Sequence, residues 1–164
     1  MIQVRKGRLQ DLEEIRRVAL EAWQATYTSI ISAAQIDFML NRFYHPEILS
    51  AQMNDPEHHF YMLEDAGKVC GYAHCYPEAD AMKLSKIYFY TTAKGKGYGK
   101  ILIEYCEQEA VQLGYGKMIL NVNRHNPAQH FYLKMGYQIL EEVDIPLDVY
   151  WLNDYVMGKE LHQH

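Results

Sequence analysis

Apolar residues recur along the first third of the chain with the spacing of amphipathic helices. Apolar residues at helical spacing are expected to form one face of a first helix: Leu12, Ile15, Val18, Ala19 and Ala22. Asp11 and Glu14 stand three residues apart at the start of this stretch, an arrangement typical of a helix cap. The same spacing predicts a second helix over 32–43, and the pair His45-Pro46 separates it from a short helix over 47–53.

After this helical third, the pattern changes to short runs typical of strands. Strands are expected over 60–64, 69–76 and 82–90, in addition to a first strand over 2–5. The polar turns between the three central runs predict hairpins. These neighbours should therefore pair in antiparallel fashion.

The second half alternates strands and helices around a glycine-rich loop. Helices are expected over 97–113 and 126–135, and strands over 117–122, 137–142 and 150–157. A strand, helix and strand in this order imply a right-handed parallel crossover. The fold class is therefore α/β, with a mixed sheet. Ligands of such sheets lie beyond the carboxyl ends of the strands, where the loops 93–100 and 122–127 are expected. With no repeat or linker, one domain over 1–164 is the expectation.

Composition and charge narrow the function classes. The formal charge of −5, from 16 basic and 21 acidic residues, argues against a dedicated nucleic-acid binder. The three cysteines form no CxxC pair, and the eight histidines match no metal-binding pattern, so no metal is expected. Neither a signal peptide nor a membrane-spanning apolar run is evident, so we expect a cytoplasmic protein without membrane or nucleic-acid partners.

The glycine loop is the strongest chemical signal in the chain. Glycines alternate with other residues directly after an apolar strand and before a helix. Without Cβ atoms, backbone N–H groups can approach a phosphate closely, and the helix N-terminus adds partial positive charge. The lysines add diffuse positive charge suited to a polyphosphate. The loop consists of Lys94, Gly95, Lys96, Gly97, Tyr98, Gly99 and Lys100.

Two familiar phosphate-binding motifs do not fit this loop. A nucleotide-binding P-loop needs Ser or Thr after the lysine, but Ile101 follows Lys100. A dinucleotide fingerprint needs another glycine spacing and an acidic residue about 20 positions on. That region contains Ile119, Leu120 and Asn121 instead.

The segment 126–137 supplies a second signal. Asn126 suits a helix N-cap, Pro127 the first helical position and Gly136 the residue beyond the end. Taken alone, this segment is equally typical of an ordinary amphipathic helix. Taken together with the loop, in this order and spacing, it resembles the GNAT superfamily of N-acetyltransferases.

In that family an R/Q-x-x-G-x-G/A loop binds the pyrophosphate of coenzyme A, and here Lys94 stands where Arg or Gln is usual. A downstream N-x-x-A-x-x-x-Y-x-x-x-G-F/Y segment follows, with Ala128 one place early in this chain. Residues 22–27 look like the acceptor-side helix of the family, and 154–157 like its last strand. The implied fold is a mostly antiparallel sheet flanked by helices, with a splayed parallel strand pair.

The resemblance implies roles for individual residues. Acetyl-CoA would be the co-substrate, with its pyrophosphate on residues 94–100 and its pantetheine arm along backbone groups of Ile87 and Phe89 and beside Asn126. The Phe89 N–H would stabilise the oxyanion, and Tyr132 would protonate the leaving thiolate. Trp23 and Tyr27 are candidate acceptor contacts.

The resemblance leaves the proton acceptor and the acceptor molecule open. Many relatives carry a glutamate on the central strand, but residues 82–86 hold no carboxylate. Ser85 could hold a water, with Glu78, Asp80 or His74 receiving the proton. The chain is most similar to the polyamine and small-amine acetyltransferase branch, so a small amine or polyamine is the preferred acceptor. A protein N-terminus or lysine, and a non-catalytic coenzyme A sensor, are the alternatives. Relatives commonly dimerise, so a homodimer is one expectation.

Overall fold

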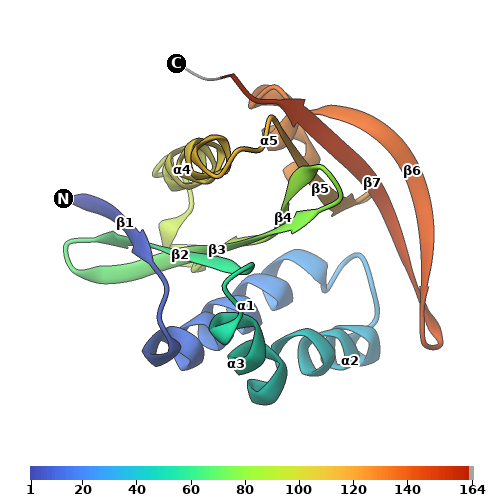
Figure 1. The fold of residues 1–164 in the computed structure, drawn as a ribbon. Helices are drawn as coiled ribbons and strands as arrows, with labels where there is room; N and C mark the ends of the chain where they lie inside the picture. Colours follow the sequence, from blue (N-terminus) through green and yellow to red (C-terminus); the bar gives the residue numbers. More distant parts are fainter. Residues whose placement is uncertain (163–164) are drawn as a thin grey trace.

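A seven-stranded sheet lies between two layers of helices in the computed structural model, which describes residues 1–162 (Figure 1). The strand order is β1-β2-β3-β4-β5-β7-β6. Every neighbouring pair is antiparallel except β4 and β5, which are parallel. Helices α1, α2 and α3 cover one face, and α4 and α5 lie on the other. The predicted fold class is therefore confirmed.

The elements follow the predicted order. The strands are β1 (Ile2–Lys6), β2 (His59–Asp65), β3 (Lys68–Glu78), β4 (Ala81–Phe89), β5 (Lys117–Asn123), β6 (Gln138–Leu147) and β7 (Tyr150–Glu160). The helices are α1 (Leu12–Tyr27), α2 (Ala33–Tyr44), α3 (Pro46–Asn54), α4 (Tyr98–Gln112) and α5 (Ala128–Lys134), with 3-10 turns at Leu9–Asp11 and Thr91–Ala93. No helix within residues 1–162 has the length and apolar character needed to cross a membrane.

The closing hairpin is longer than predicted. β6 continues to Leu147, although the sequence pattern predicted its end at residue 142. The additional residues include Asp144 and Pro146, which are unusual within a central strand. β6 is the outermost strand of the sheet and is mostly solvent-exposed, and an edge strand tolerates proline because one side of its backbone needs no partner. The hairpin extends down past the helical layer formed by α1 to α3 (Figure 1).

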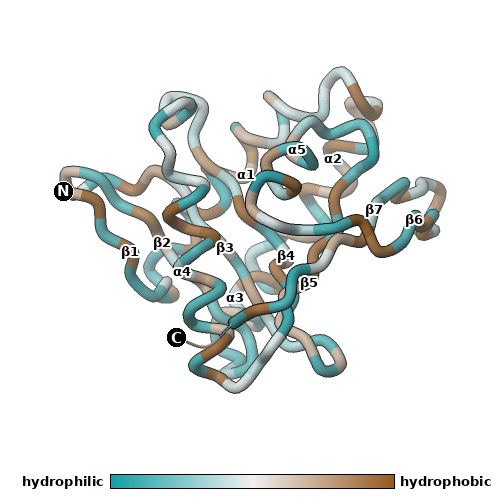
Figure 2. Tube along the Cα trace, turned by 90° about the horizontal axis from the view of Figure 1, so that it is seen from above, coloured by the Kyte–Doolittle hydropathy of each residue, from teal (hydrophilic) through white to brown (hydrophobic). Residues whose placement is uncertain are grey.

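Alternating side chains of the strands feed two separate cores. In β2, Tyr61 and Leu63 pack with α4, whereas Phe60 and Met62 pack with α1 and its neighbours. This alternation follows from the two-residue period of a strand. Hydrophobic and hydrophilic residues accordingly alternate along the chain instead of gathering at one end (Figure 2).

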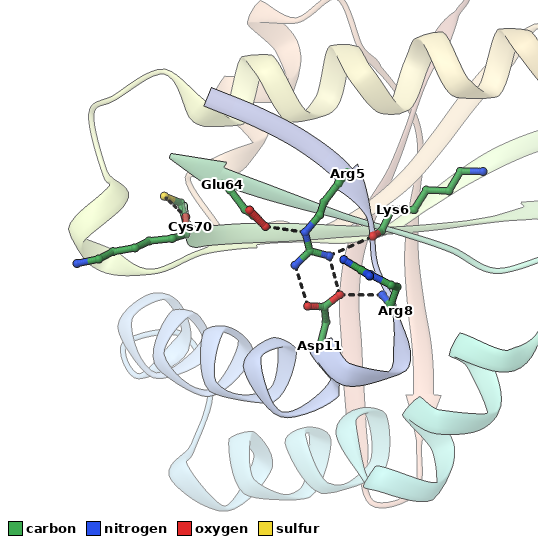
Figure 3. A network of polar contacts seen from close by, with 7 residues as sticks. Arg5, Lys6, Arg8, Asp11, Glu64 and Cys70 are labelled. Carbon is green, nitrogen blue, oxygen red and sulfur yellow. Dashed lines mark hydrogen bonds and ion pairs between the residues drawn. The ribbon is translucent and has the colours of Figure 1, made fainter. Parts of the chain in front are cut away.

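The predicted capping pair at the start of α1 is wrong. Asp11 accepts hydrogen bonds from the Arg5 guanidinium at 2.8 and 2.9 Å and from the Arg8 backbone N–H at 2.8 Å. Arg5 also donates to Glu64 at 2.6 Å, so the group ties β1, β2 and the start of α1 together (Figure 3). Glu14 instead accepts a hydrogen bond from the Tyr90 hydroxyl. The half-buried Arg5 of β1 therefore engages the Asp11 carboxylate in place of the predicted helix cap.

One irregularity in β4 determines the shape of the sheet centre. Its register with β3 passes from His74↔Lys86 to Cys75↔Leu84, which leaves Ser85 as an extra residue in a β-bulge. Bulges bend a strand and increase its twist. The parallel β4–β5 pairing correspondingly covers only Met82↔Met118 and Lys83↔Ile119. Beyond those residues the two strands diverge, as the splayed pair in the predicted fold requires.

Candidate active site

The glycine loop enters α4 through two left-handed residues. Gly95 has φ 81° and Gly97 has φ 77°, a region that favours glycine. An added Cβ at either position would meet no described atom within 4 Å, so backbone conformation, not crowding by the protein, requires glycine there. The sequence pattern predicted Gly97 in the first turn of the helix, and this is wrong: Gly97 is the N-cap that precedes α4.

The amides of this loop after Lys94 have no hydrogen-bond acceptor among the residues that the structure describes. Among residues 1–162, none accepts a hydrogen bond from the N–H groups of residues 95–100. The side chains of Lys94, Lys96 and Lys100 are exposed around them. Lys100 approaches Glu104 at 3.9 Å, a long surface ion pair of little energetic weight. A set of free donors with nearby positive charge is chemically suited to an anionic ligand such as a diphosphate.

The side chain of Tyr98 has a structural role. Its ring is buried near Phe89, and its hydroxyl donates a hydrogen bond to Asp65, the last residue of β2. The hydrogen bond to Asp65 raises the pKa of Tyr98 to about 12, so the phenol keeps its proton. Tyr98 therefore fixes the loop to the sheet, and only its backbone N–H is available for a ligand.

The backbone of β4 offers unpaired groups on the side where β5 diverges. The Tyr90 N–H donates to the Cys70 carbonyl at 2.9 Å, which identifies that pair as a hydrogen-bonded pair of the β3–β4 ladder. Bonded and non-bonded pairs alternate along antiparallel strands. The polar backbone groups of Ile87 and Phe89 consequently point away from β3, toward the diverging β5. The registered β4–β5 pairs end before them, at Lys83.

Asn126 connects α5 to α1. Its Oδ1 accepts from the Ala128 N–H at 2.9 Å, and its Nδ2 donates to the Tyr27 hydroxyl at 3.3 Å. The side chain is buried. Both polar ends are therefore already engaged, which leaves the second Nδ2 hydrogen and the backbone for any ligand. Its role beside the pantetheine arm stays a prediction.

Tyr132 is buried on α5, next to Phe131 and Tyr137. Burial, with a smaller contribution from Tyr27, raises the pKa of its phenol, which is therefore protonated at neutral pH. Within residues 1–162, no side chain or backbone group forms a hydrogen bond with its hydroxyl. A protonated, unpaired hydroxyl can donate to an incoming group.

A cavity of about 600 Å³ lies on the face of β4 that is directed toward α1 and α2, opposite to the face that packs on α4. Trp23 and Tyr27, the two predicted acceptor contacts, both line it. Its remaining walls come from segments far apart in the sequence, including the closing hairpin. They include Met39, Phe43, His58, Lys83, Ser85, Lys86, Tyr88, Asn121, Ile145, Leu152 and Asp154.

The bulge at Ser85 decides which side chains of β4 reach this cavity. Met82, Leu84 and Ile87 pack into the core on the α4 side. Lys83, Lys86 and Tyr88 line the cavity. Without the extra residue, strict alternation would place Lys86 on the same face as Leu84.

The predicted proton acceptors occupy different places. Ser85 lines the cavity, whereas Asp80 is exposed and Glu78 is exposed beside Lys83, 3.4 Å away. His74 is fully buried, and its Nε2 lies 2.8 Å from Nδ1 of His58. Desolvation lowers the pKa of His74 to about 2, so it is neutral at physiological pH.

Sequence reasoning missed the carboxylate that does line the cavity. Asp154 is half-buried in β7, and Asn121 Nδ2 donates to it at 3.4 Å. Burial raises the pKa of Asp154, against the opposing effects of Asn121 and of the positive charges of Lys83 and Arg124. A carboxylate with a raised pKa is a stronger base than an ordinary surface aspartate. Its position in a closing strand, distant in sequence from β4, offered no signal of this role.

Histidine, cysteine and acidic side chains do not assemble into a metal centre. Within residues 1–162, no three or more of them lie close enough together to hold a metal ion.

Comparison with known proteins adds independent evidence. The profile of the Acetyltransferase (GNAT) family matches residues 12–137. The crystal structure of a PaiA N-acetyltransferase from Thermoplasma acidophilum in complex with coenzyme A superimposes with a TM-score of 0.86, at 25% identity over 98% of this chain and 99% of that one.

Two curated proteins are similar over nearly their full length. A spermidine N(1)-acetyltransferase from Thermoplasma acidophilum is 28% identical, with 97% of each chain covered. An uncharacterized N-acetyltransferase, Rv2669, from Mycobacterium tuberculosis is 26% identical over 93% of this chain and 99% of its own.

Proposed function

This chain belongs to the acetyltransferase (GNAT) family, and on that premise we propose that it transfers the acetyl group of acetyl-CoA to a primary amine of a small molecule. The family match and the similar coenzyme A complex establish an N-acetyltransferase that uses acetyl-CoA. The acceptor and the roles of single residues are our proposal.

The observation that carries this proposal is the meeting of two open regions at β4. The free amides of residues 95–100 follow the carboxyl end of β4, and the gap where β5 diverges runs along one edge of β4. The cavity lined by Trp23, Tyr27 and Asp154 lies on the face of β4 that is directed toward α1 and α2. An acyl donor and an amine could thus approach the same stretch of backbone from two directions.

Coenzyme A would be held mainly by main-chain groups. The amides of residues 95–100 would bind the pyrophosphate oxygens, with Lys94, Lys96 and Lys100 adding positive charge. Ile87 and Phe89 would pair with the pantetheine arm as an added strand does. When bound, acetyl-CoA supplies an activated thioester.

Three groups of the chain would then assist the transfer. The Phe89 N–H would donate to the carbonyl oxygen, where negative charge develops. The Tyr132 hydroxyl would provide a proton at the leaving sulfur, consistent with a phenol that is protonated and unpaired. Asp154 would accept a proton from the acceptor ammonium, directly or through a water near Ser85, because only a neutral amine is nucleophilic.

The walls of the cavity favour a small acceptor over a protein segment. Helix α2 encloses it with Met39 and Phe43, and the closing hairpin with Ile145 and Leu152. A folded protein could present only a narrow chain end to this space. The similarity to a spermidine N(1)-acetyltransferase supports an amine of small size.

The test is direct. Calorimetry with acetyl-CoA should give a binding isotherm, and a screen of polyamines, amino acids and N-terminal peptides, followed by free-thiol release, should identify an acceptor among the small amines. Binding without transfer to any amine would favour a coenzyme A sensor. Transfer to peptides alone would favour a protein acetyltransferase and contradict our proposal.

A further inference from the structure

Lys86 places a positive charge in the wall of the acceptor cavity. The residue follows the bulge of β4 and lines the cavity beside Tyr88. Its Nζ lies 4.7 Å from the ring centroid of Tyr44 and 6.0 Å from that of Phe43. The aliphatic stem is thereby held against α2, and the ammonium stays within an aromatic surround.

No carboxylate of the described part of the chain pairs with this ammonium. Among residues 1–162, no acidic group lies within 4 Å of Lys86 Nζ. Lys83, the other cavity lysine of β4, is paired with Glu78 at 3.4 Å. Desolvation lowers the pKa of Lys86 to about 8, which still leaves it mostly protonated at neutral pH. A partly buried charge without a counterion is destabilising, so its presence calls for an explanation.

Two other polar groups of the cavity wall also lack a hydrogen-bond partner among the described residues. Trp23 Nε1 and Gln52 Oε1 are buried without a hydrogen-bond partner among the described residues, and both side chains belong to the cavity wall. Of the described residues in that wall, Asp154 is the single carboxylate, and Lys83 and Lys86 are the two lysines. Since Lys83 is paired with Glu78, the cavity offers one acidic group for an amine, Asp154, and one ammonium that no described carboxylate pairs, Lys86.

We propose that Lys86 binds an anionic group of the acceptor, so that the preferred acceptor is a primary amine that also carries a carboxylate or a phosphate. This inference rests on the proposed function and specifies its acceptor class. The ammonium of such a molecule would lie toward Asp154 and its anion toward Lys86. A polyamine would instead place a second cation near Lys86, where repulsion in a partly desolvated space is strong.

Matched acceptors test this proposal. Transfer rates should be compared for amino acids and their carboxamides, which have the same shape without the charge, and for O-phosphoethanolamine and ethanolamine. We expect kcat/KM to favour the anionic member by about 10- to 100-fold, the range for a hydrogen bond to a charged partner. The pair that shows the larger ratio distinguishes carboxylate from phosphate acceptors.

Variants of Lys86 assign the preference to this side chain. Lys86→Met keeps the length of the stem and should reduce the ratio to near one, whereas Lys86→Arg should restore much of it. Lys83→Met is the matched control, because Lys83 is already paired, and should retain the ratio. A preference for polyamines or carboxamides in the wild type, or an undiminished ratio in Lys86→Met, would overturn the proposal.

A binding measurement separates this inference from the proposed function. With coenzyme A present, thermal shift should detect tighter binding of anionic amines by the wild type than by Lys86→Met. If no amine is acetylated but this difference persists, the proposed function fails and the anion site stands. If amines are acetylated without any such difference, the anion site fails.

Discussion

The two halves of the site are built in different ways. The loop 94–100 is one continuous segment whose free backbone N–H groups are the proposed ligand contacts, and Gly95 and Gly97 adopt left-handed conformations there. The acceptor cavity is built from side chains of α1, α2, β4, β5 and the closing hairpin. The first region is therefore recognisable in a linear sequence, whereas the second exists only after folding. Substitutions should affect the two regions differently.

The largest effect is expected at the loop. Gly97→Val forces a β-branched residue into the left-handed region and turns the amides of 95–100 away from one another. Affinity for acetyl-CoA should fall by at least about 100-fold, which corresponds to roughly 2.7 kcal/mol, as measured by calorimetry.

Gly67→Val is the matched control for this loop variant. Gly67 has φ 78° and open space around it, but it lies in the β2–β3 turn. It should lose comparable stability and keep its affinity. Equal loss of affinity in both variants would show that the effect of Gly97→Val is general destabilisation.

Tyr132 stands between the two regions and should affect turnover without affecting binding. Tyr132→Phe removes only the unpaired hydroxyl, so kcat should fall by about 100-fold, as expected for loss of a general acid, with acetyl-CoA affinity nearly unchanged. Steady-state kinetics and calorimetry measure the two effects. Tyr105→Phe, a half-buried tyrosine of α4 whose ring centroid lies 5.3 Å from that of Tyr61, should change neither; wild-type kcat in Tyr132→Phe would remove Tyr132 from the mechanism.

Asp154 tests the acceptor side by its pH dependence. The carboxylate must be ionised to accept a proton, and burial raises its pKa above the ordinary 3.8. In the wild type, kcat/KM should therefore rise with pH through a midpoint above 3.8, and Asp154→Asn should lower kcat/KM by about 10- to 100-fold and remove this limb.

The same pKa shift predicts the stability of this variant. An acid with a raised folded-state pKa loses stability as pH rises through that pKa, because the buried charge is costly. Asp154→Asn should therefore be no less stable than the wild type at neutral pH. Asp144→Asn, on the exposed hairpin strand, serves as the control; an unchanged pH profile in Asp154→Asn would assign the proton to another group.

The smallest effect on function is expected far from both regions. Arg5→Met breaks the contacts that tie β1 and β2 to the start of α1 (Figure 3). The free energy of unfolding should fall by about 1–2 kcal/mol in chemical denaturation, with kcat and cofactor affinity retained.

Acid should erase this difference. Arg5 lowers the pKa of Asp11, so the stabilisation is present above pH 3.8 and is lost as pH falls through the lower folded-state value. Arg17 is exposed and forms an ion pair with Glu14 at the surface of α1, so Arg17→Met should have little effect. Loss of turnover in Arg5→Met at full stability would contradict a purely structural role.

The order and type of the elements followed from local pattern, because apolar spacing and turn residues act within a few positions. The glycine loop could be identified from the sequence for the same reason, because the backbone conformation and the free N–H groups of a loop depend on the residues of one short segment. Pattern failed where distant groups competed: Arg5 draws Asp11 away from its expected cap, and an edge position carries β6 through Pro146.

The sequence by itself determined the fold class, and it also singled out the glycine loop 94–100 as a candidate phosphate site and Tyr132 as a candidate acid. Only the tertiary structure brought Asp154 and Lys86 into one cavity. Lys86 belongs to β4 and Asp154 to β7, and along the chain α4, β5, α5 and β6 lie between these two strands. The tertiary structure also revealed the bulge at Ser85, an unopposed residue next to which β4 diverges from β5 and Lys86 faces the cavity. Register between strands is a property of the pairing, and no single strand encodes it.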